Sequence, residues 1–196
     1  GVFLFGGTIS NCVIAGNYAR AGHLRTTVGG GVYMSGGVIR DSRIERNQAV
    51  GSATGWGGSS YGGGMAVAGG RVVNCLVTSN RVQRTANGGG VDWSSSYGSG
   101  GGLYMSGGSA ANCTLADNVA FTNNPSGTAG AGVYQAGGAV TNTIAYFNRA
   151  FVTADDFAAA GGTVTYSCAP ELTTGAGNLT GDPQFVNTGA GDFELQ

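Results

Sequence analysis

A segment of seventeen residues recurs along this chain without internal gaps, and this recurrence limits the possible fold more than any other feature. The clearest copy runs from Gly31 to Asn47 and reads GVYMSGGVIRDSRIERN. Similarity at a nearly fixed period is typical of solenoids, in which each unit buries its apolar surface against its neighbours. The copies occupy residues 1–17, 31–47, 64–80, 102–118 and 132–148, and a divergent sixth copy begins at Asp156.

Alternation inside the copy predicts strands. When the copy is numbered from one to seventeen, positions two and four are mostly apolar, and positions nine, twelve and fourteen are apolar or small. A period of two is that of a β-strand. Two glycines at positions six and seven allow the positive φ of a sharp bend. We expect two or three short strands in each copy, with the side chains at these five positions pointing inward.

The spacing of the copies predicts how the strands are connected. Successive copies begin 24 to 38 residues apart, so length varies after the seventeen-residue segment and not inside it, as in loops on a rigid scaffold. Parallel strands of one coil stack on the next at about 4.8 Å. We predict an all-β, right-handed parallel β-helix of about five to six coils, with repeats in residues 1–170 and a closing segment of the same domain in residues 171–196.

Composition excludes several classes of protein. Forty glycines with three prolines and no three-residue period exclude a collagen-like helix. A net charge of −1, with nine arginines and no lysine, leaves no basic surface for nucleic acid or an anionic membrane. Apolar runs are too short to insert into a bilayer. Because the sequence lacks an initial methionine and a signal peptide, we expect a processed or excised piece of a longer protein.

The cysteines predict buried free thiols. Cys12, Cys75 and Cys113 share position twelve, and Cys168 lies outside this pattern. Residues stacked in register have poor torsion angles for a disulfide, and a buried thiol packs as a small apolar group. With a single histidine, His23, and no Cys-x-x-Cys motif, we expect neither a metal site nor a cofactor.

Asparagine recurs at two positions that we expect to be corners of each coil. Asparagine tolerates the left-handed backbone conformation and bonds to its own turn, so stacked asparagines form amide ladders. We interpret them as structural, with ligand binding as the alternative. Position seventeen carries Asn17, Asn47, Asn80, Asn118 and Asn148, and position eleven carries Asn11, Asp41, Asn74, Asn112 and Asn142.

Aromatic residues supply the candidate binding sites. Trp56 and Tyr61 in one loop are echoed by Trp93 and Tyr97 in the next, separated in both by small residues. Such rings stack on sugars, or they cover the wall of the helix. Position three also carries aromatic residues that point outward between two inward positions, as a shallow binding face or as a seat for a neighbouring segment. These residues are Phe3, Tyr33, Tyr104 and Tyr134.

Charged residues do not form a recognisable catalytic set. A hydrolase needs carboxylates that converge, and a lyase needs an acidic calcium site with a base. The aspartates fall at different positions of the coil, and the adjacent pair Asp155 and Asp156 points apart in a strand. We expect no catalytic residues. Arg40, Arg43 and Arg46 lie with Asp41 and Glu45 on one coil, which favours a solvated, salt-bridged face, with an anion-binding patch as the alternative.

Two kinds of motif carry a resemblance to known proteins. Glycine clusters followed by an aliphatic residue, such as Gly29-Gly30-Gly31-Val32, and aliphatic-x-x-Asn, such as Ile44-Glu-Arg-Asn47, resemble the GGA-I and F-x-x-N repeats of polymorphic outer-membrane and autotransporter-type passenger domains. The phenylalanine of the second motif is aliphatic here, so the resemblance is to the broad class of bacterial β-helix repeat proteins. The tail, residues 177–196, resembles the closing segment of large secreted, surface-anchored bacterial β-helix proteins.

The resemblance implies an extracellular or cell-surface location. From it and from the residues we expect a non-catalytic structural or adhesive β-solenoid, either a stalk, a passenger or a fibre-forming segment, with glycan or partner contact through its aromatic residues. The alternative is a partial or degenerate polysaccharide lyase or hydrolase, because β-helices also host such enzymes. We expect the partners to be further copies of the chain stacked end to end, or further repeats of a longer parent.

Overall fold

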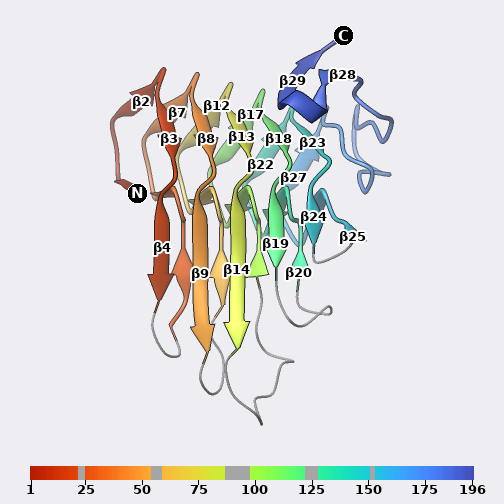
Figure 1. Cartoon of the computed structure of the whole chain (residues 1–196). Coiled ribbons are helices and arrows are strands. Elements are labelled where there is room, and N and C mark those ends of the chain that lie inside the picture. Colours follow the sequence, from red (N-terminus) through yellow and green to blue (C-terminus); the bar gives the residue numbers. More distant parts are fainter. Residues whose placement is uncertain (22–24, 54–58, 87–97, 122–127, 151–152) are drawn as a thin grey trace.

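The computed structural model describes residues 1–21, 25–53, 59–86, 98–121, 128–150 and 153–196. The chain forms a parallel β-helix whose coils follow one another from the N-terminal to the C-terminal end (Figure 1). The near strands run downward while the coils advance to the right, so the helix is right-handed. The first strands of the coils make a sheet of six, which confirms the predicted fold and the number of coils.

Three sheets, which we call A, B and C, contain the strands of the seventeen-residue repeat. Sheet A consists of β1 (Val2–Leu4), β6 (Val32–Met34), β11 (Met65–Val67), β16 (Leu103–Met105), β21 (Val133–Gln135) and β26 (Phe157–Ala159). Sheet B consists of β2 (Thr8–Ser10), β7 (Val38–Arg40), β12 (Arg71–Val73), β17 (Ser109–Ala111), β22 (Ala139–Thr141) and β27 (Thr163–Thr165). Sheet C consists of β3 (Val13–Ala15), β8 (Arg43–Glu45), β13 (Leu76–Thr78), β18 (Thr114–Ala116) and β23 (Ile144–Tyr146).

Two further sheets, D and E, come from the segments between the copies. Sheet D consists of β4 (Tyr18–Ala21), β9 (Gln48–Ala53), β14 (Arg81–Ala86), β19 (Val119–Phe121) and β24 (Arg149–Ala150), with β25 (Thr153–Ala154) added antiparallel at the end. Sheet E consists of β5 (Thr27–Val28), β10 (Ser60–Tyr61), β15 (Gly98–Ser99) and β20 (Thr128–Ala129). The expectation that these segments are only loops is therefore wrong for the parts that begin and end them.

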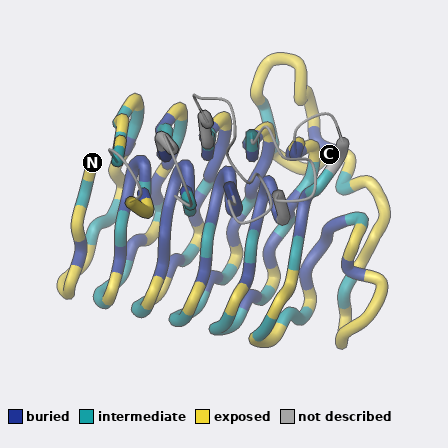
Figure 2. Tube along the Cα trace, turned by 90° about the horizontal axis from the view of Figure 1, so that it is seen from below, coloured by how far each residue is buried: buried dark blue, intermediate teal, exposed yellow. Residues whose placement is uncertain are grey.

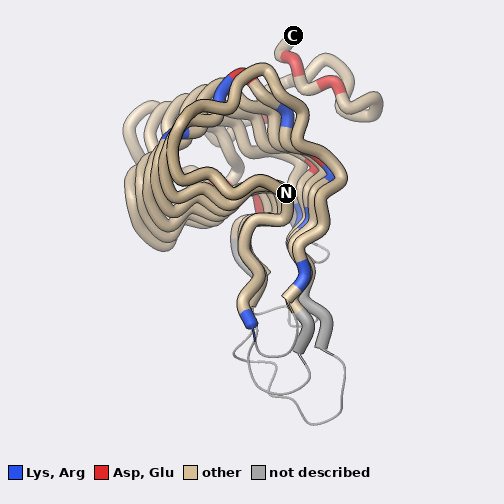
Figure 3. Tube along the Cα trace, turned by 90° about the vertical axis from the view of Figure 1, so that its left-hand side faces the viewer, with Lys and Arg blue, Asp and Glu red and all other residues tan. Residues whose placement is uncertain are grey.

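Viewed along the axis, the coils have a wide body and a narrow arm (Figure 3). Sheets A, B and C surround the body, and sheets D and E lie against each other in the arm. Small side chains fill the space between the two arm sheets and form a second core. This core contains Ala49, Val82, Ala120, Ala131 and Ala150.

Strand pairing keeps equivalent positions of the copies side by side. Val2 pairs with Val32, Val32 with Met65, and Met65 with Leu103, all in parallel register. Equivalent side chains therefore stack along the axis, and buried residues recur at the same places in the inner coils (Figure 2). The main core contains the inward ladders that the alternation predicts, including Met34, Ile39 and Ile44, all fully buried.

The terminal coils depart from this inward pattern. Ala159, at position four of the sixth copy, is exposed, so its predicted place in the core is wrong. Cys12, at position twelve of the first copy, is also exposed. In the described structure each belongs to a coil that is flanked on one side only, so the coil that would cover the side chain is not there.

Two corners of the coil use left-handed backbone at residues other than glycine. Position eleven does so in all five regular copies, with φ of 48° to 55°. Position sixteen does so as well, at Arg46, Ser79, Asp117 and Phe147, with φ of 53° to 62°. Asparagine and aspartate at position eleven suit this conformation, whereas the varied residues at position sixteen gave no sequence signal.

Residues that follow the sixth copy fold back on the last coils. Cys168 forms parallel bridges with Ile144 and with Leu179, so two more short segments extend sheet C. The chain then ends in an antiparallel hairpin of β28 (Phe185–Asn187), the short 3-10 helix η2 (Thr188–Ala190) and β29 (Asp192–Leu195). Phe185 is buried and lies between Phe147 and Phe193. In the described part of the chain, no helix is long and apolar enough to cross a membrane.

Candidate functional site: an aromatic groove

The position-three residues lie in register on the outer face of sheet A. Phe3 pairs with Tyr33, and Tyr104 pairs with Tyr134. Neighbouring parallel strands lie about 4.8 Å apart, which is close enough for rings on the same face to stack. Phe3 is 58% exposed and the three tyrosines are partly exposed, so the predicted outward direction is confirmed.

The rings form two separate stacks. In the first, the centroids of Phe5 and Phe3 lie 4.3 Å apart, and those of Phe3 and Tyr33 lie 4.7 Å apart. In the second, Tyr104 and Tyr134 are nearly parallel, with an interplanar angle of 7° and centroids 5.6 Å apart. Tyr61 joins the second stack from sheet E, with its centroid 4.5 Å from that of Tyr104.

Ala66 separates the two stacks. It occupies position three of the third copy, between Tyr33 and Tyr104, and it contributes only a methyl group where the neighbouring copies have a ring. A hollow of about 250 Å³ results, which we call the aromatic groove. Its lining consists of Thr26, Val28, Tyr33, Tyr61, Ala66, Val67, Ala68, Tyr104 and Ser106.

The aromatic groove is uncharged but contains hydroxyl groups. None of the described residues that line it is ionised at neutral pH. Burial, and then the neighbouring Tyr61 and Tyr134, raise the pKa of the Tyr104 phenol above its ordinary value. The Tyr104 hydroxyl therefore stays a hydrogen-bond donor at neutral and moderately alkaline pH.

The predicted aromatic loops are only partly covered by the described structure. Trp56, Trp93 and Tyr97 lie outside the described residues, so the expected pairing of the two loops stays a prediction. Tyr61, which the sequence placed in the first of these loops, belongs to β10 and enters the groove. The closeness of Tyr61 to Tyr104 had no sequence signal, because the two residues belong to different sheets.

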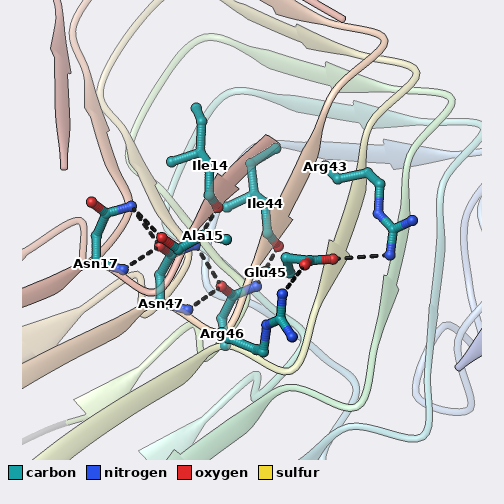
Figure 4. Close-up of polar contacts among 9 residues, drawn as sticks. Ile14, Ala15, Asn17, Arg43, Ile44, Glu45, Arg46 and Asn47 are labelled. Carbon is teal, nitrogen blue, oxygen red and sulfur yellow. Dashed lines mark hydrogen bonds and ion pairs between the residues drawn. The ribbon is translucent and has the colours of Figure 1, made fainter. Parts of the chain in front are cut away.

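The asparagines of position seventeen form a buried ladder. The backbone N–H and the Nδ2 of each donate to Oδ1 of the next, at 2.9 to 3.0 Å, from Asn17 through Asn148. Nδ2 also bonds back to the core strand, as Asn47 does to the carbonyl of Ile14 at 2.8 Å (Figure 4). Amides occupied in this way are structural, as the sequence predicted.

The asparagines of position eleven stay near the surface. Asn74 Nδ2 donates to Asp41 at 2.7 Å, and Asn142 Nδ2 donates to Asn112 at 2.7 Å. Asn11 is exposed at the same corner of the first coil. The amide ladder is thus continuous and buried at position seventeen, whereas the described bonds at position eleven are exposed pairs.

The arginines of the second coil form ion pairs at the surface. Arg40 pairs with Asp41 at 2.8 Å. Arg43 pairs with Glu45 at 2.9 Å, and Arg46 also pairs with Glu45 (Figure 4). The arginine side chains are 52% to 70% exposed. This arrangement matches the predicted salt-bridged face, and pairs as exposed as these contribute about 0 to 1 kcal/mol to stability.

The remaining described carboxylates of interest are bound to hydrogen-bond donors. Asp117 accepts from the hydroxyl of Ser79 at 2.9 Å. Asp155 accepts a hydrogen bond from the backbone N–H of Gly130, and Asp156 accepts one from the backbone N–H of Asn148. Asp92 lies outside the described residues. Among the residues the structure covers, no group of three or more His, Cys, Asp or Glu side chains could hold a metal ion.

Glu171 has a structural role that the sequence did not indicate. It accepts hydrogen bonds from the backbone N–H groups of Asp156 and Phe157, at 3.0 and 3.2 Å. It therefore satisfies donors at the start of the last coil. The divergent sixth copy gave no pattern from which this contact could be predicted.

The thiols are free, as expected. Cys75, Cys113 and Cys168 are buried and Cys12 is exposed. The Cys113 thiol contacts the Cys75 thiol. This contact, and then burial, hold the pKa of Cys113 well above the ordinary range. The same contact lowers the pKa of Cys75, whose thiol is only 3% exposed. Burial, and then the charge of Asp182, raises the pKa of Cys168. The raised pKa values of Cys113 and Cys168 leave these two thiols poorly disposed to act as nucleophiles.

Comparisons of the chain with protein-family models, with curated proteins and with solved structures found no match. Strand order and register therefore establish the architecture. They place the chain among parallel β-solenoids.

Proposed function

We propose that the chain is a non-catalytic extracellular β-solenoid that serves as a rigid scaffold and adheres to glycans through the aromatic groove. The groove beside Ala66 is the observation that carries this proposal. Tyrosine rings offer an apolar face for the C–H groups of a sugar, and their hydroxyls can bond to sugar hydroxyls. A groove held by strands is also better fixed than one on loops.

Rigidity follows from the two ladders that run along the axis. The apolar core joins all six coils, and the amide ladder links the first five, from the partly buried Asn17 to the buried Asn148. A coil cannot tilt away from its neighbour without breaking both. Such a rod suits a stalk or passenger that holds a binding face away from a surface.

The extracellular location rests on sequence resemblance. The glycine clusters and aliphatic-x-x-Asn motifs resemble those of autotransporter-type passengers and of secreted, surface-anchored β-helix proteins. Passenger, adhesin and stalk proteins of bacteria are the classes that this resemblance suggests. Secretion of the full-length parent, followed by surface labelling of the intact cells, tests this part of the proposal.

A partial or degenerate polysaccharide lyase or hydrolase is the competing function. Fold alone does not decide between scaffold and enzyme, because catalysis depends on a site. The engagement of Asp117, Asp155 and Asp156 with hydrogen-bond donors favours the scaffold. Incubation with polyuronates and neutral glycans, followed by detection of new unsaturated or reducing ends, separates the two. Product formation would replace the proposed function by the enzymatic one.

Stacking with another coil is part of the proposed scaffold role. Sheets A and B end in β1 and β2 on one side and in β26 and β27 on the other, and among the described residues each of these strands has a strand partner on one side only. Such edges are templates for a further strand layer. We propose that another copy of the chain, or further repeats of a longer parent, completes them. Light scattering over a range of protein concentrations would reveal end-to-end assembly as a growing mass.

Direct binding measurements test the adhesive role. The chain is applied to a panel of immobilised neutral and acidic glycans, and the bound fraction is measured against a denatured sample. We expect binding to at least one class of glycan. Absence of binding to the whole panel would overturn the adhesive role and leave only a scaffold.

A further inference from the structure

Position three of sheet A reveals where a ligand fits. Counting along the sheet, this position holds Phe3, Tyr33, Ala66, Tyr104, Tyr134 and Ala158. If the third copy also carried a ring, the outer face would bear an uninterrupted stack from the first coil to the fifth. The single alanine interrupts the run, and the hollow beside it is lined by Tyr33 from the second coil and by Tyr61 and Tyr104.

We propose that the aromatic groove beside Ala66 is a subsite for one uncharged pyranose ring of a glycan chain. This inference rests on the proposed glycan adhesion and specifies its place and its ligand. The apolar C–H face of the sugar packs on the rings of Tyr33 and of the pair Tyr61 and Tyr104. Its hydroxyls lie within the reach of the tyrosine hydroxyls and of Ser106 and Thr26, which line the same hollow.

Size selects a single sugar unit. The hollow has a volume of about 250 Å³, which is just below the usual range of small-molecule sites, about 300 to 1,000 Å³. Ala66 itself is only 2% exposed, so the surrounding residues, and above all the tyrosine rings, form the surface that a sugar would contact. A chain of several sugars would therefore place one unit in the hollow, and its other units would continue over the neighbouring rings of sheet A.

Charge selects a neutral sugar. No arginine or other cation is among the described residues that line the hollow, so the carboxylate of a uronic acid would lose water without gaining a partner. The arginines of the second coil are already paired with Asp41 and Glu45 on sheets B and C. A neutral hexose or pentose has no charge that must be desolvated. Its hydroxyls can exchange hydrogen bonds with the hydroxyl groups that line the hollow.

Filling the gap gives a direct test. Ala66→Tyr places a ring where the neighbouring copies have one, and Ala158→Tyr makes the same change at the same position of the sixth copy, away from the hollow. We expect Ala66→Tyr to weaken binding of neutral oligosaccharides by at least about tenfold and Ala158→Tyr to leave it unchanged. Binding is measured by titration of the full chain, with the aromatic NMR signals of Tyr33, Tyr61 and Tyr104 as the local readout.

A second variant covers the case in which Ala66→Tyr does not fold. Tyr33→Ala removes one wall and leaves the core untouched, so we expect a folded protein with at least about tenfold weaker binding. Undiminished binding by folded Ala66→Tyr or Tyr33→Ala would overturn this subsite while leaving glycan adhesion intact. Selective binding of oligouronates would overturn the neutral ligand. Failure of the wild-type chain to bind any glycan would instead overturn the proposed adhesion.

Discussion

The backbone N–H and the Nδ2 of Asn148 both donate to Oδ1 of Asp156, at 2.6 and 2.7 Å. Asp156 thus takes the place in the amide ladder that an asparagine takes in every earlier coil. The substitution puts a carboxyl group into a site that is 2% exposed. Burial is the largest cause that raises the pKa of Asp156 to about 6, and the charges of Glu171 and Asp155 add to it.

This pKa predicts how stability depends on pH. The folded state holds the proton of Asp156 more tightly than the unfolded chain, whose aspartates titrate near pH 3.9. The contribution of this proton to stability is therefore complete below about pH 4 and is lost as the pH rises through about 6. Asp156→Asn keeps the acceptor and removes the charge. We expect a higher melting temperature at pH 7 and a flatter stability profile between pH 4 and pH 6.

Two features sharpen this pH experiment. The pKa of Asp155 is also raised, mainly by burial, so part of the slope remains in Asp156→Asn. Asp117→Asn, at an exposed corner, is the matched control. A profile of Asp156→Asn that runs parallel to the wild type from pH 4 to pH 7 would contradict the prediction.

The buried ladder predicts a large difference between two asparagines. Asn80 accepts two hydrogen bonds from Asn47 and donates to Ile44 and to Asn118, all in buried surroundings. Asn80→Ala leaves several of these groups without a partner, at about 1 to 3 kcal/mol each. We expect a loss of more than about 3 kcal/mol in the free energy of unfolding, measured by urea denaturation.

Asn74→Ala is the comparison for Asn80→Ala. Asn74 is exposed, has a φ of 55°, and donates to Asp41. Alanine there loses one surface hydrogen bond and adopts a left-handed conformation, which costs about 1 to 2 kcal/mol. Equal losses for the two variants would show that the position-seventeen ladder does not hold the coils together.

Glycine at position one predicts a second stability effect. A Cβ built on Gly64 would lie 2.9 Å from Cγ of Asn80 and 2.7 Å from the carbonyl oxygen of Gly102. Gly64→Ala therefore forces the ladder or the backbone to move, which costs about 1 to 3 kcal/mol. Gly6→Ala is the control, because nothing lies within 4 Å of its Cβ. Thermal unfolding of the two variants should show a lower melting temperature only for Gly64→Ala.

Burial predicts which thiols react in the native protein. Cys12 is exposed, whereas Cys75 and Cys113 are each only 3% exposed and Cys168 is 9% exposed. A thiol-specific reagent should modify Cys12 quickly and the other three only after unfolding. Cys12→Ser should remove the fast reaction. Recovery of fewer than four thiols from the wild type in denaturant without reductant would indicate a disulfide and contradict the free state.

Much of the body of the helix was predictable from the repeat. Parallel strands in register bring each position next to its own equivalent, so a pattern such as Ile14, Ile44 and Val77 must become a stack. The same reasoning gave the asparagine ladder and the outward direction of Tyr33 and its equivalents. These features depend only on alternation within a strand and on a constant length of the copy.

The sequence by itself determined the coil, its register and its inward and outward faces, because one short pattern fixes them locally in every copy. Tertiary structure alone decided the arm, the place of Asp156 in the amide ladder, and the groove. Sheets D and E arise because neighbouring segments without a common pattern still pair their backbones. Asp156 enters the ladder because the chain turns back only eight residues after Asn148. Tyr61 reaches Tyr104 from another sheet, and the hollow beside Ala66 exists only because these rings are brought together by the closed coil.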